Sequence, residues 1–463
     1  MTAIHARRQD SIPATAPATV VVGLGRTGLS VARFLAARGG HFAVTDSRRD
    51  PPGLESLRRE LPQTPIAAGG FDADLLAGAG LIVVSPGVPL SEPALLAARA
   101  RGAEVIGDVE LFARHVDAPV IAITCANGKS TVTTLVGEMA RAAGREVRVG
   151  GNLGTPALDL LAAGRPDLYV LELSSFQLET VQSLNARAAT VLNITPDHMD
   201  RYRTLADYAA AKRRVYRGDG AMVINADDPL VAAMREDGRR TLRFSTGMAG
   251  GADFGLCRRA GEAWLARGDE PLLPVRELRI RGLHNVANAL AALALGTAAG
   301  IPEAAAITAL RGFAGLPHRC QWLAARGGVD WFDDSKGTNV GATCAAIAGL
   351  AQGDDQDGRR VVLIAGGDGK GQDFSGLAQA AAGRVRAAVV LGRDGPQIAR
   401  VLEGTLPVAR AIDMEDAVHQ AAALAVAGDA VLLSPACASF DMFRDYVHRG
   451  EVFAAAVRRY CAA

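Results

Sequence analysis

Short apolar runs recur along the chain, and each is followed by a small-residue or polar loop. The first two runs are 18–22 and 42–45, and the stretch 29–37 between them carries apolar residues at helical spacing. Short runs of β-branched and aliphatic residues bounded by Gly, Pro, Ser or Asp are typical of strands that are buried on both faces. Because such strands alternate with helical patterns, the sequence predicts parallel sheets covered by helices, an α/β fold.

The elements separate into three groups, as a length of 463 residues leads us to expect. We predict a disordered lead-in over 1–18, a Rossmann-like domain over 19–116, a central P-loop ATPase-type α/β domain over 117–313 and a C-terminal Rossmann-like domain over 314–463. Within the central domain, 241–283 has short alternating runs with many Gly and Pro residues. That pattern predicts small antiparallel strands.

A glycine-rich turn, Gly23-Leu-Gly25-Arg-Thr-Gly28, follows the first strand, and Asp46 ends the second. This is the dinucleotide-binding fingerprint and by itself indicates an NAD-dependent oxidoreductase. The same N–H groups also fit the diphosphate of a nucleotide sugar, because their geometry does not depend on the rest of the ligand. A later strand, 81–85, ends in Ser85-Pro-Gly87. That turn is either a ligand loop at a strand end or a plain turn.

The stretch Thr124-Cys-Ala-Asn-Gly-Lys-Ser-Thr131 lies between an apolar strand, 119–123, and a helical pattern. A strand, a tight loop with Gly-Lys-Ser and a helix form a phosphate cradle, in which backbone N–H groups and the helix N-terminus face an anion. Lys129 then reaches the β- and γ-phosphates, and the hydroxyl of Ser130 or Thr131 is suited to Mg²⁺.

Two positions depart from the usual phosphate loop. Ile123 and Cys125 stand where such loops commonly carry Gly. A Cβ at Cys125 is predicted to crowd the backbone near the phosphates. The alternative is an ordinary loop before a helix, capped by a lysine.

Carboxylates and amides follow the next strands. The strand 167–172 ends at Glu172, and a carboxylate after a phosphate loop suits Mg²⁺, which binds oxygen ligands. The glycine-rich loop 150–154 contributes one amide, Asn152. Asn288, near the start of a later helix, is placed to reach a nucleotide or simply to cap the helix.

His198 and Lys212 are further candidates in the central domain. The strand 189–195 runs into a polar segment with His198, which is either a functional or a packed histidine. Lys212 follows Tyr208 at i, i+4 on a helix face. A cation is out of place beside a metal, so Lys212 is either a surface residue or carbamylated into an anionic ligand.

Four strands of the third domain, 329–333, 361–365, 387–391 and 430–433, each lead into a small-residue loop and a helical pattern, which predicts a second doubly wound sheet. Lys336 and Lys370 lie in two of these loops and suit an anionic substrate such as an amino acid.

Composition excludes several classes. The formal net charge is +1, so no general attraction to nucleic acid or membranes is expected, and no apolar run approaches a membrane span. The six cysteines are scattered, as expected for free thiols in a reducing cytoplasm. We expect a cytoplasmic monomer that binds small molecules.

An ATP cradle, a magnesium carboxylate, a nucleotide-like site and a basic third domain together fit a ligase. The plausible reaction transfers the γ-phosphoryl group of ATP to a carboxylate, and an amine then displaces phosphate from the acyl phosphate.

Several long motifs resemble those of the Mur ligase family over nearly the whole chain. They are 120–139, 171–179, 193–202, 315–319, 334–339, 366–370 and 434–439. The resemblance implies an ATP-dependent enzyme that joins D-glutamate to UDP-N-acetylmuramoyl-L-alanine in peptidoglycan precursor synthesis, with ATP and two Mg²⁺ ions.

The resemblance also implies roles for individual residues. The UDP substrate would be bound by Gly25, Arg26, Thr27, Asp46, Ser47, Ser85, Pro86, Gly87, Asn152 and His198. ATP would be bound by Asn127, Gly128, Lys129, Ser130, Thr131, Asn288, Arg319 and Asp334. Glutamate would be bound by Lys336, Thr338, Lys370, Ser439, Phe440 and Tyr446. The metal ligands would be Ser130, Glu172, His198 and a carbamylated Lys212, and the catalytic residues Lys129, Glu172, His198, Lys212 and His318.

Three other hypotheses remain open at this point. One is the same ligase acting on L-glutamate, and another is the oxidoreductase indicated by the glycine-rich turn. The third is a UDP-sugar-binding protein in which Cys125 impairs ATP turnover. A ligase that adds glutamate to folate is disfavoured by the UDP-type first domain.

Overall fold

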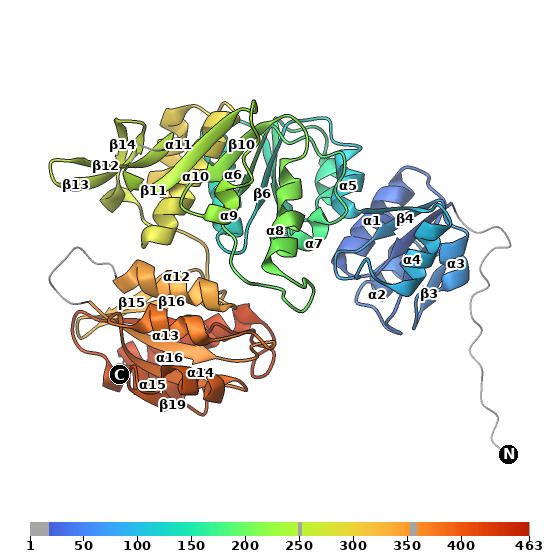
Figure 1. The fold of residues 1–463 in the computed structure, drawn as a ribbon. Helices are drawn as coiled ribbons and strands as arrows, with labels where there is room; N and C mark the ends of the chain where they lie inside the picture. The colour runs from blue at the N-terminus through green and yellow to red at the C-terminus, as the bar shows by residue number, and fades with distance from the viewer. Residues whose placement is uncertain (1–17, 249–251, 352–358, 463) are drawn as a thin grey trace, which may run out of the picture.

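The computed structural model describes residues 18–248, 252–351 and 359–462. They form three α/β units that follow one another along the chain, each with its own sheet. Figure 1 shows the first unit, in blue, beside the central unit, and the C-terminal unit, in orange and red, below the other part of the central unit. The three-domain α/β prediction is therefore confirmed. Residues 1–17 of the expected lead-in lie outside the described residues.

The first unit has a five-stranded parallel sheet in the order β3-β2-β1-β4-β5. Its strands are β1 Thr19–Val22, β2 Phe42–Asp46, β3 Ile66–Ala68, β4 Leu81–Val84 and β5 Glu104–Gly107, and its helices are α1 Arg26–Ala37, α2 Leu54–Glu60, α3 Ala73–Ala77, α4 Pro93–Ala100 and α5 Asp108–Ala113. The order reverses between β1 and β4, where open α/β sheets bind ligands. Helix α1 begins three residues before the predicted 29–37. It passes so close to the turn that a Cβ on Gly28 would lie 1.8 Å from the Gly23 carbonyl oxygen.

The central unit has a nine-stranded sheet in the order β14-β13-β12-β11-β10-β9-β6-β8-β7. Its strands are β6 Val120–Thr124, β7 Val147–Gly151, β8 Leu168–Glu172, β9 Ala188–Val191, β10 Ala221–Asn225, β11 Thr241–Met248, β12 Phe254–Arg259, β13 Glu262–Arg267 and β14 Glu270–Pro274. Its helices are α6 Lys129–Ala142, η1 Leu158–Ala163, α7 Ser175–Leu178, α8 Leu205–Arg213, η2 Arg214–Tyr216, α9 Pro229–Ala232, η4 Val275–Glu277, α10 Leu283–Ala298 and α11 Glu303–Gly312. The Ala- and Leu-rich α10 packs against α6 and is buried on most of its surface.

Two predictions for the central unit were partly wrong. Strands β12 to β14 pair antiparallel as expected, but β11 pairs parallel with β10 and extends the main sheet. The strand predicted over 189–195 ends at Val191. The chain leaves the sheet there because the Ile194 N–H donates to Asp228 Oδ2 at 2.7 Å instead of to a neighbouring strand.

The C-terminal unit has a six-stranded sheet in the order β15-β16-β20-β17-β18-β19, with β15 antiparallel to β16. Its strands are β15 Gln321–Arg326, β16 Val329–Asp333, β17 Val361–Gly366, β18 Val385–Leu391, β19 Val408–Arg410 and β20 Ala430–Leu433. Its helices are α12 Val340–Ala351, α13 Ser375–Ala381, α14 Gly395–Leu402, α15 Met414–Leu424 and α16 Tyr446–Ala462. All four predicted strands are present, and the two edge strands, β15 and β19, were not predicted. Among the described residues, no helix is long and apolar enough to cross a membrane.

Candidate active site

The phosphate loop connects β6 to α6, and Asn193, which lies after β9, forms two hydrogen bonds with it. The Asn127 N–H donates to Asn193 Oδ1 at 2.9 Å, and Asn193 Nδ2 donates to the Asn127 carbonyl at 2.8 Å. Gly128 precedes the helix with φ 98°, and a Cβ there would lie 2.6 Å from Asn288 Oδ1. Only glycine combines this backbone conformation with this close approach. The loop geometry is therefore specified by residues on three different elements.

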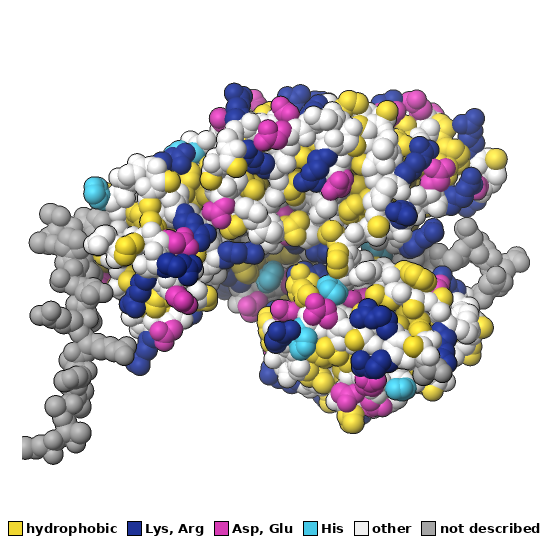
Figure 2. All heavy atoms as spheres, turned by 180° about the vertical axis from the view of Figure 1, so that it is seen from behind, with side chains coloured by type: hydrophobic (Ala, Val, Ile, Leu, Met, Phe, Trp, Pro, Cys, Tyr) yellow, Lys and Arg dark blue, Asp and Glu magenta, His cyan; other side chains and the backbone are white. Residues whose placement is uncertain are grey.

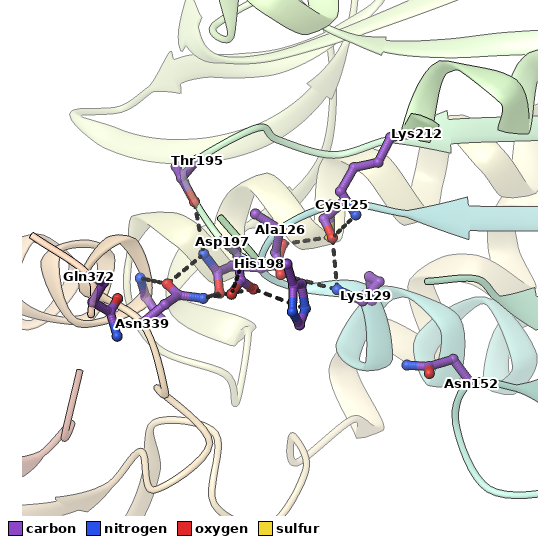
Figure 3. Close-up of polar contacts among 12 residues, drawn as sticks. Cys125, Ala126, Lys129, Asn152, Thr195, Asp197, His198, Lys212, Asn339 and Gln372 are labelled. Atoms are coloured by element: carbon purple, nitrogen blue, oxygen red, sulfur yellow. Dashed lines mark hydrogen bonds and ion pairs between the residues drawn. The ribbon is translucent and has the colours of Figure 1, made fainter. Parts of the chain in front are cut away.

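Lys129 opens α6 and lies over the loop. Its Nζ donates to the carbonyls of Cys125 at 2.7 Å and Ala126 at 3.1 Å (Figure 3). The side chain of Cys125 is fully buried in the core with Ile123 and Val132, and the crowding that was predicted for its Cβ near bound phosphates stays a prediction. Its thiol also donates to the Asn127 carbonyl at 2.8 Å. The cysteine thus packs beneath the loop and links two of its residues.

Ser130 and Glu172 meet beside the loop. Ser130 Oγ donates to Glu172 Oε2 at 2.6 Å, and Asn152 Nδ2 donates to Glu172 Oε1 at 2.7 Å. Arg319, which precedes β15, donates from Nη2 to Ser130 Oγ at 2.7 Å. A hydroxyl and a carboxylate with both oxygens oriented form the kind of oxygen-only donor set that suits Mg²⁺. Ser130 and Glu172 are therefore the residues that could hold a magnesium ion.

Lys212 is the most deeply buried of the predicted site lysines. Only 1% of its surface is exposed, and its Nζ donates to the Cys125 carbonyl at 2.8 Å and Thr124 Oγ1 at 3.3 Å. Burial, together with the nearby charge of Lys129, holds the pKa of Lys212 well below its ordinary value. The lowered pKa favours the unprotonated amine, which is the form that reacts with carbon dioxide in carbamylation.

His198 lies in the irregular segment after β9, with its backbone at φ 57°. Its ring stacks at a tilt on Phe176, 4.8 Å between centroids, and its Nε2 lies 3.7 Å from Asp197 Oδ2. Partial burial lowers the pKa of His198 against the opposing effect of Asp197. The His198 ring is therefore protonated less readily than a free imidazole. Figure 3 shows His198 on the same side of the loop as Lys129.

Eight of the ten predicted UDP-binding residues lie at the carboxyl ends of β1, β2 and β4 in the first unit, whereas Asn152 and His198 lie in the central unit. Ser85 Oγ donates to the Gly23 carbonyl at 2.8 Å and so joins two of the three loops. Asp46 accepts the Leu24 N–H at 2.6 Å and pairs with Arg48 at 2.7 Å. Asp46 Oδ1 accepts hydrogen bonds from the Arg48 N–H at 2.8 Å and from Arg48 Nε at 2.9 Å, so both carboxylate oxygens are engaged within the loops. Arg201, from the segment after β9, donates to the Pro86 carbonyl at 3.4 Å and connects this site to the central unit.

A cavity of about 140 Å³ lies between the phosphate loop and the C-terminal unit. Asn127, Asn288, Arg319, Asp334 and Lys336 are among the residues that line it. Figure 2 shows a groove between the central and C-terminal units in which histidine and cationic side chains gather. Burial raises the pKa of Asp334 to about 7, against the hydrogen bond donated by Ser434 Oγ at 2.7 Å. The cavity is lined by predicted ATP-binding residues of both units and by the predicted glutamate-binding residue Lys336.

The predicted glutamate-binding residues are only partly brought together. Lys336 Nζ lies 3.7 Å from the centre of the Tyr446 ring, and burial lowers the pKa of Lys336 to about 8. Ser439 is buried at the end of the β20 loop. Lys370 and Phe440, by contrast, are exposed.

His318 lies in the segment that enters the C-terminal unit. Its Nδ1 is 2.7 Å from Asp333 Oδ2, and this carboxylate raises the pKa of His318. The His318 imidazole is therefore oriented by the last residue of β16, and Asp334 and Lys336 follow directly after the same strand.

Sequence reasoning missed residues that join the units. Asn339 Nδ2 donates to Asp197 Oδ2 at 3.3 Å and to Asn127 Oδ1 at 3.4 Å, so one side chain of the C-terminal unit contacts both the phosphate loop and the His198 segment (Figure 3). Asn193 and Arg201 were likewise not predicted as site residues. All three lie inside quoted motifs, but no local pattern distinguishes an interdomain contact from a capping residue.

Comparison with known proteins decides the family. Family models match residues 17–107 (Mur ligase MurD-like, N-terminal domain), 123–296 (Mur ligase middle domain) and 318–437 (Mur ligase, glutamate ligase domain). A protein of Nitrosococcus oceani named UDP-N-acetylmuramoylalanine–D-glutamate ligase is 58% identical over 447 residues, which are 96% of this chain and 97% of that protein. The chain belongs to the Mur ligase family. It is therefore an ATP-dependent ligase that forms amide bonds.

Other Mur ligases agree with this assignment. The identically named protein of Pseudomonas aeruginosa is 54% identical over 95% of this chain and 97% of its own length. Among solved structures, a UDP-N-acetylmuramate-alanine ligase, MurC, from Thermotoga maritima matches with a TM-score of 0.58 at 20% identity, covering 96% of this chain and 99% of that one. A pseudomurein peptide ligase type C from Methanothermus fervidus matches with a TM-score of 0.60 at 18% identity, covering 96% and 99%. At these identities the structures support the shared three-domain fold.

Proposed function

We propose that this Mur ligase joins D-glutamate to the carboxyl group of UDP-N-acetylmuramoyl-L-alanine, using ATP, in cytoplasmic peptidoglycan precursor synthesis. The observation that carries the proposal is the pair Ser130–Glu172, which meets Arg319 from the C-terminal segment beside the phosphate loop. The names of relatives that are more than half identical over nearly the whole chain support the choice of substrates.

Each unit would contribute most of the residues for one substrate, and the C-terminal unit would also contribute Arg319 and Asp334 to ATP binding. Residues 19–116 would bind the UDP part through the loops that end β1, β2 and β4. Residues 117–313 would bind ATP at the phosphate loop, and 314–463 would bind glutamate near Lys336, Thr338 and Ser439. The roles suggested by the family resemblance for the other site residues are proposed here unchanged, including those of Lys370 and Phe440.

The chemistry would proceed in two steps. The substrate carboxylate attacks the γ-phosphorus of ATP, the bond to the β-phosphate oxygen breaks, and ADP leaves. The glutamate amine then attacks the acyl phosphate, loses a proton and expels phosphate, which leaves the amide. Lys129 and Arg319 would neutralise the charge that develops on the transferred phosphoryl group. Closure of the units around the cavity would keep water from the acyl phosphate.

Mg²⁺ would supply further charge neutralisation when bound. Ser130 and Glu172 have the oxygen donors for the first ion. His198 and Lys212 would serve a second ion only after carbamylation, since an amine does not replace the oxygen ligands that Mg²⁺ prefers. The protein is further proposed to act as a monomer on these small molecules.

The test is phosphate release from ATP and Mg²⁺ in the presence of UDP-N-acetylmuramoyl-L-alanine, with D-glutamate, L-glutamate or neither. We expect release that needs both the UDP substrate and D-glutamate, and none from the Lys129→Met variant. Release with L-glutamate alone would retain the ligase and overturn its stereospecificity. Binding of the UDP substrate without any release would favour a binding protein, and a fluorescence change of NADH on mixing would favour the oxidoreductase.

A further inference from the structure

Helix α16 carries a cation that is enclosed by the C-terminal unit. Arg449 has 2% of its surface exposed, so it is almost completely shielded from solvent. Among the described residues, no carboxylate lies within 4 Å of its guanidinium group. Burial accordingly lowers the pKa of Arg449 to about 10. A buried cation of this kind is stable only if its donors are matched by acceptors.

Four hydrogen bonds provide those acceptors, and they come from two different loops. Arg449 Nε donates to Ser335 Oγ at 3.0 Å and Nη2 donates to the Ser335 carbonyl at 2.8 Å. Nη1 donates to the carbonyls of Cys437 at 3.1 Å and Ala438 at 3.3 Å. One planar guanidinium group therefore joins the loop after β16 to the loop after β20.

The residues next to these acceptors are the ones proposed to bind glutamate. Ser335 immediately precedes Lys336, and Ala438 immediately precedes Ser439. Because a guanidinium fork is rigid, it fixes the backbone of the loop after β16 relative to the backbone of the loop after β20. The distance between Lys336 and Ser439 is thus set through Arg449.

The same turn of α16 also orients the other side chains of the site. The Tyr446 carbonyl accepts a hydrogen bond from the Ser335 hydroxyl at 2.8 Å, and the Lys336 ammonium group lies over the Tyr446 ring. Gly450 follows Arg449 and lies under His318 so closely that a Cβ would be 2.2 Å from His318 Nδ1.

We propose that Arg449 is a positioning residue for the amino-acid substrate: it holds the Lys336 and Ser439 loops at the spacing that glutamate binding requires. This inference rests on the proposed function, in which these loops bind glutamate. It assigns no contact between Arg449 and the substrate. It does predict that loss of the fork weakens glutamate binding while the UDP site of the first unit stays intact.

The experiment compares Arg449→Lys and Ser335→Ala with the wild type. Lysine keeps the charge but lacks the fork. Ser335→Ala removes one acceptor of the fork and the hydrogen bond to the Tyr446 carbonyl, with a small change in volume. Both variants are expected to raise the KM for D-glutamate by at least about ten-fold, since small displacements of positioning groups have large effects. The KM for ATP and the Kd of the UDP substrate are expected to stay within about a factor of three, less than ~0.7 kcal/mol.

Arg459→Met is the matched control. Arg459 lies on the same helix but is exposed and pairs with Glu415 across the surface, so its loss should leave every constant unchanged. If Arg449→Lys and Ser335→Ala keep the wild-type KM for glutamate, the inference is overturned. It is also overturned if all three substrates weaken together with the Tm, because that pattern reports a purely structural role. Failure of the wild type to release phosphate with glutamate would instead reject the proposed function.

Discussion

Arg319 donates from Nη2 to Ser130 Oγ at 2.7 Å. Arg319 precedes the C-terminal sheet, whereas Ser130 lies in the first turn of α6 in the central unit. The contact brings a permanent positive charge to the residue that follows Lys129. The proposed ATP site therefore includes a residue from outside the central unit, and a rotation of the C-terminal unit would remove that charge.

The first prediction concerns this contact. Arg319→Ala is expected to lower kcat by at least about 10²-fold, the usual effect of removing one oriented donor to a developing charge. Phosphate release at saturating substrates measures it. Arg311→Ala is the control, because Arg311 lies just upstream on α11 and forms an exposed ion pair with Glu277. A variant at Arg319 with the wild-type kcat would remove this residue from the mechanism.

The second prediction concerns Lys212. The chain contains only four lysines, Lys129, Lys212, Lys336 and Lys370, so a lysine-specific signal is easily assigned. Incubation with ¹³C-bicarbonate is expected to give a carbamate carbonyl signal by NMR, because burial lowers the pKa of Lys212 and so favours the unprotonated amine that reacts. Lys212→Arg should lose the signal, whereas Lys370→Arg should retain it because Lys370 is exposed. A carbamate signal that persists in Lys212→Arg would refute the assignment.

The third prediction is a pH dependence of glutamate binding. Burial lowers the pKa of Lys336 to about 8, so its charge is present below that pH and is lost above it. The KM for glutamate is expected to rise above about pH 8, while the KM for ATP changes less. Because guanidinium stays charged, Lys336→Arg should abolish this rise even at reduced activity. An identical pH profile in the two proteins would contradict a role for the Lys336 charge.

The same shift affects folding. The unfolded chain keeps Lys336 protonated up to its ordinary pKa of 10.5, so between about pH 8 and 10.5 it binds more protons than the folded chain. The free energy of unfolding therefore increases with pH in this window as far as Lys336 contributes to it. Urea unfolding at pH 8 and pH 10 measures this increase in the free energy of unfolding, and the Lys336→Arg variant should lack the part that Lys336 contributes.

The fourth prediction concerns Cys125. Its side chain is part of the core, so Cys125→Ala is expected to lower the free energy of unfolding by about 1 kcal/mol through lost burial and a lost weak hydrogen bond. The KM for ATP should stay within about a factor of three, a change of less than ~0.7 kcal/mol. Cys257→Ala, in β12, serves as the control. A large gain in ATP affinity on removing the thiol would restore the hypothesis that Cys125 impairs the loop.

Much of the fold followed from local patterns. The strands at 19–22, 120–124, 361–366 and 430–433 were predicted to within a residue or two, because runs of aliphatic residues between turn residues leave little choice. Strand β9 was predicted too long, because the Ile194 N–H donates to Asp228, a residue far away in sequence, instead of to a neighbouring strand. The edge strands β15 and β19 were missed because half-exposed strands carry a weak apolar signal.

The sequence by itself determined the three α/β units, the phosphate loop and the candidate lysines and carboxylates, because each depends on residues close together along the chain. Only the tertiary structure decided that Asn339 reaches Asp197, that Arg319 reaches Ser130 and that Arg449 joins two loops. These contacts span long stretches of chain, and their energies depend on distance and burial. No periodicity or motif records either quantity before the chain is folded.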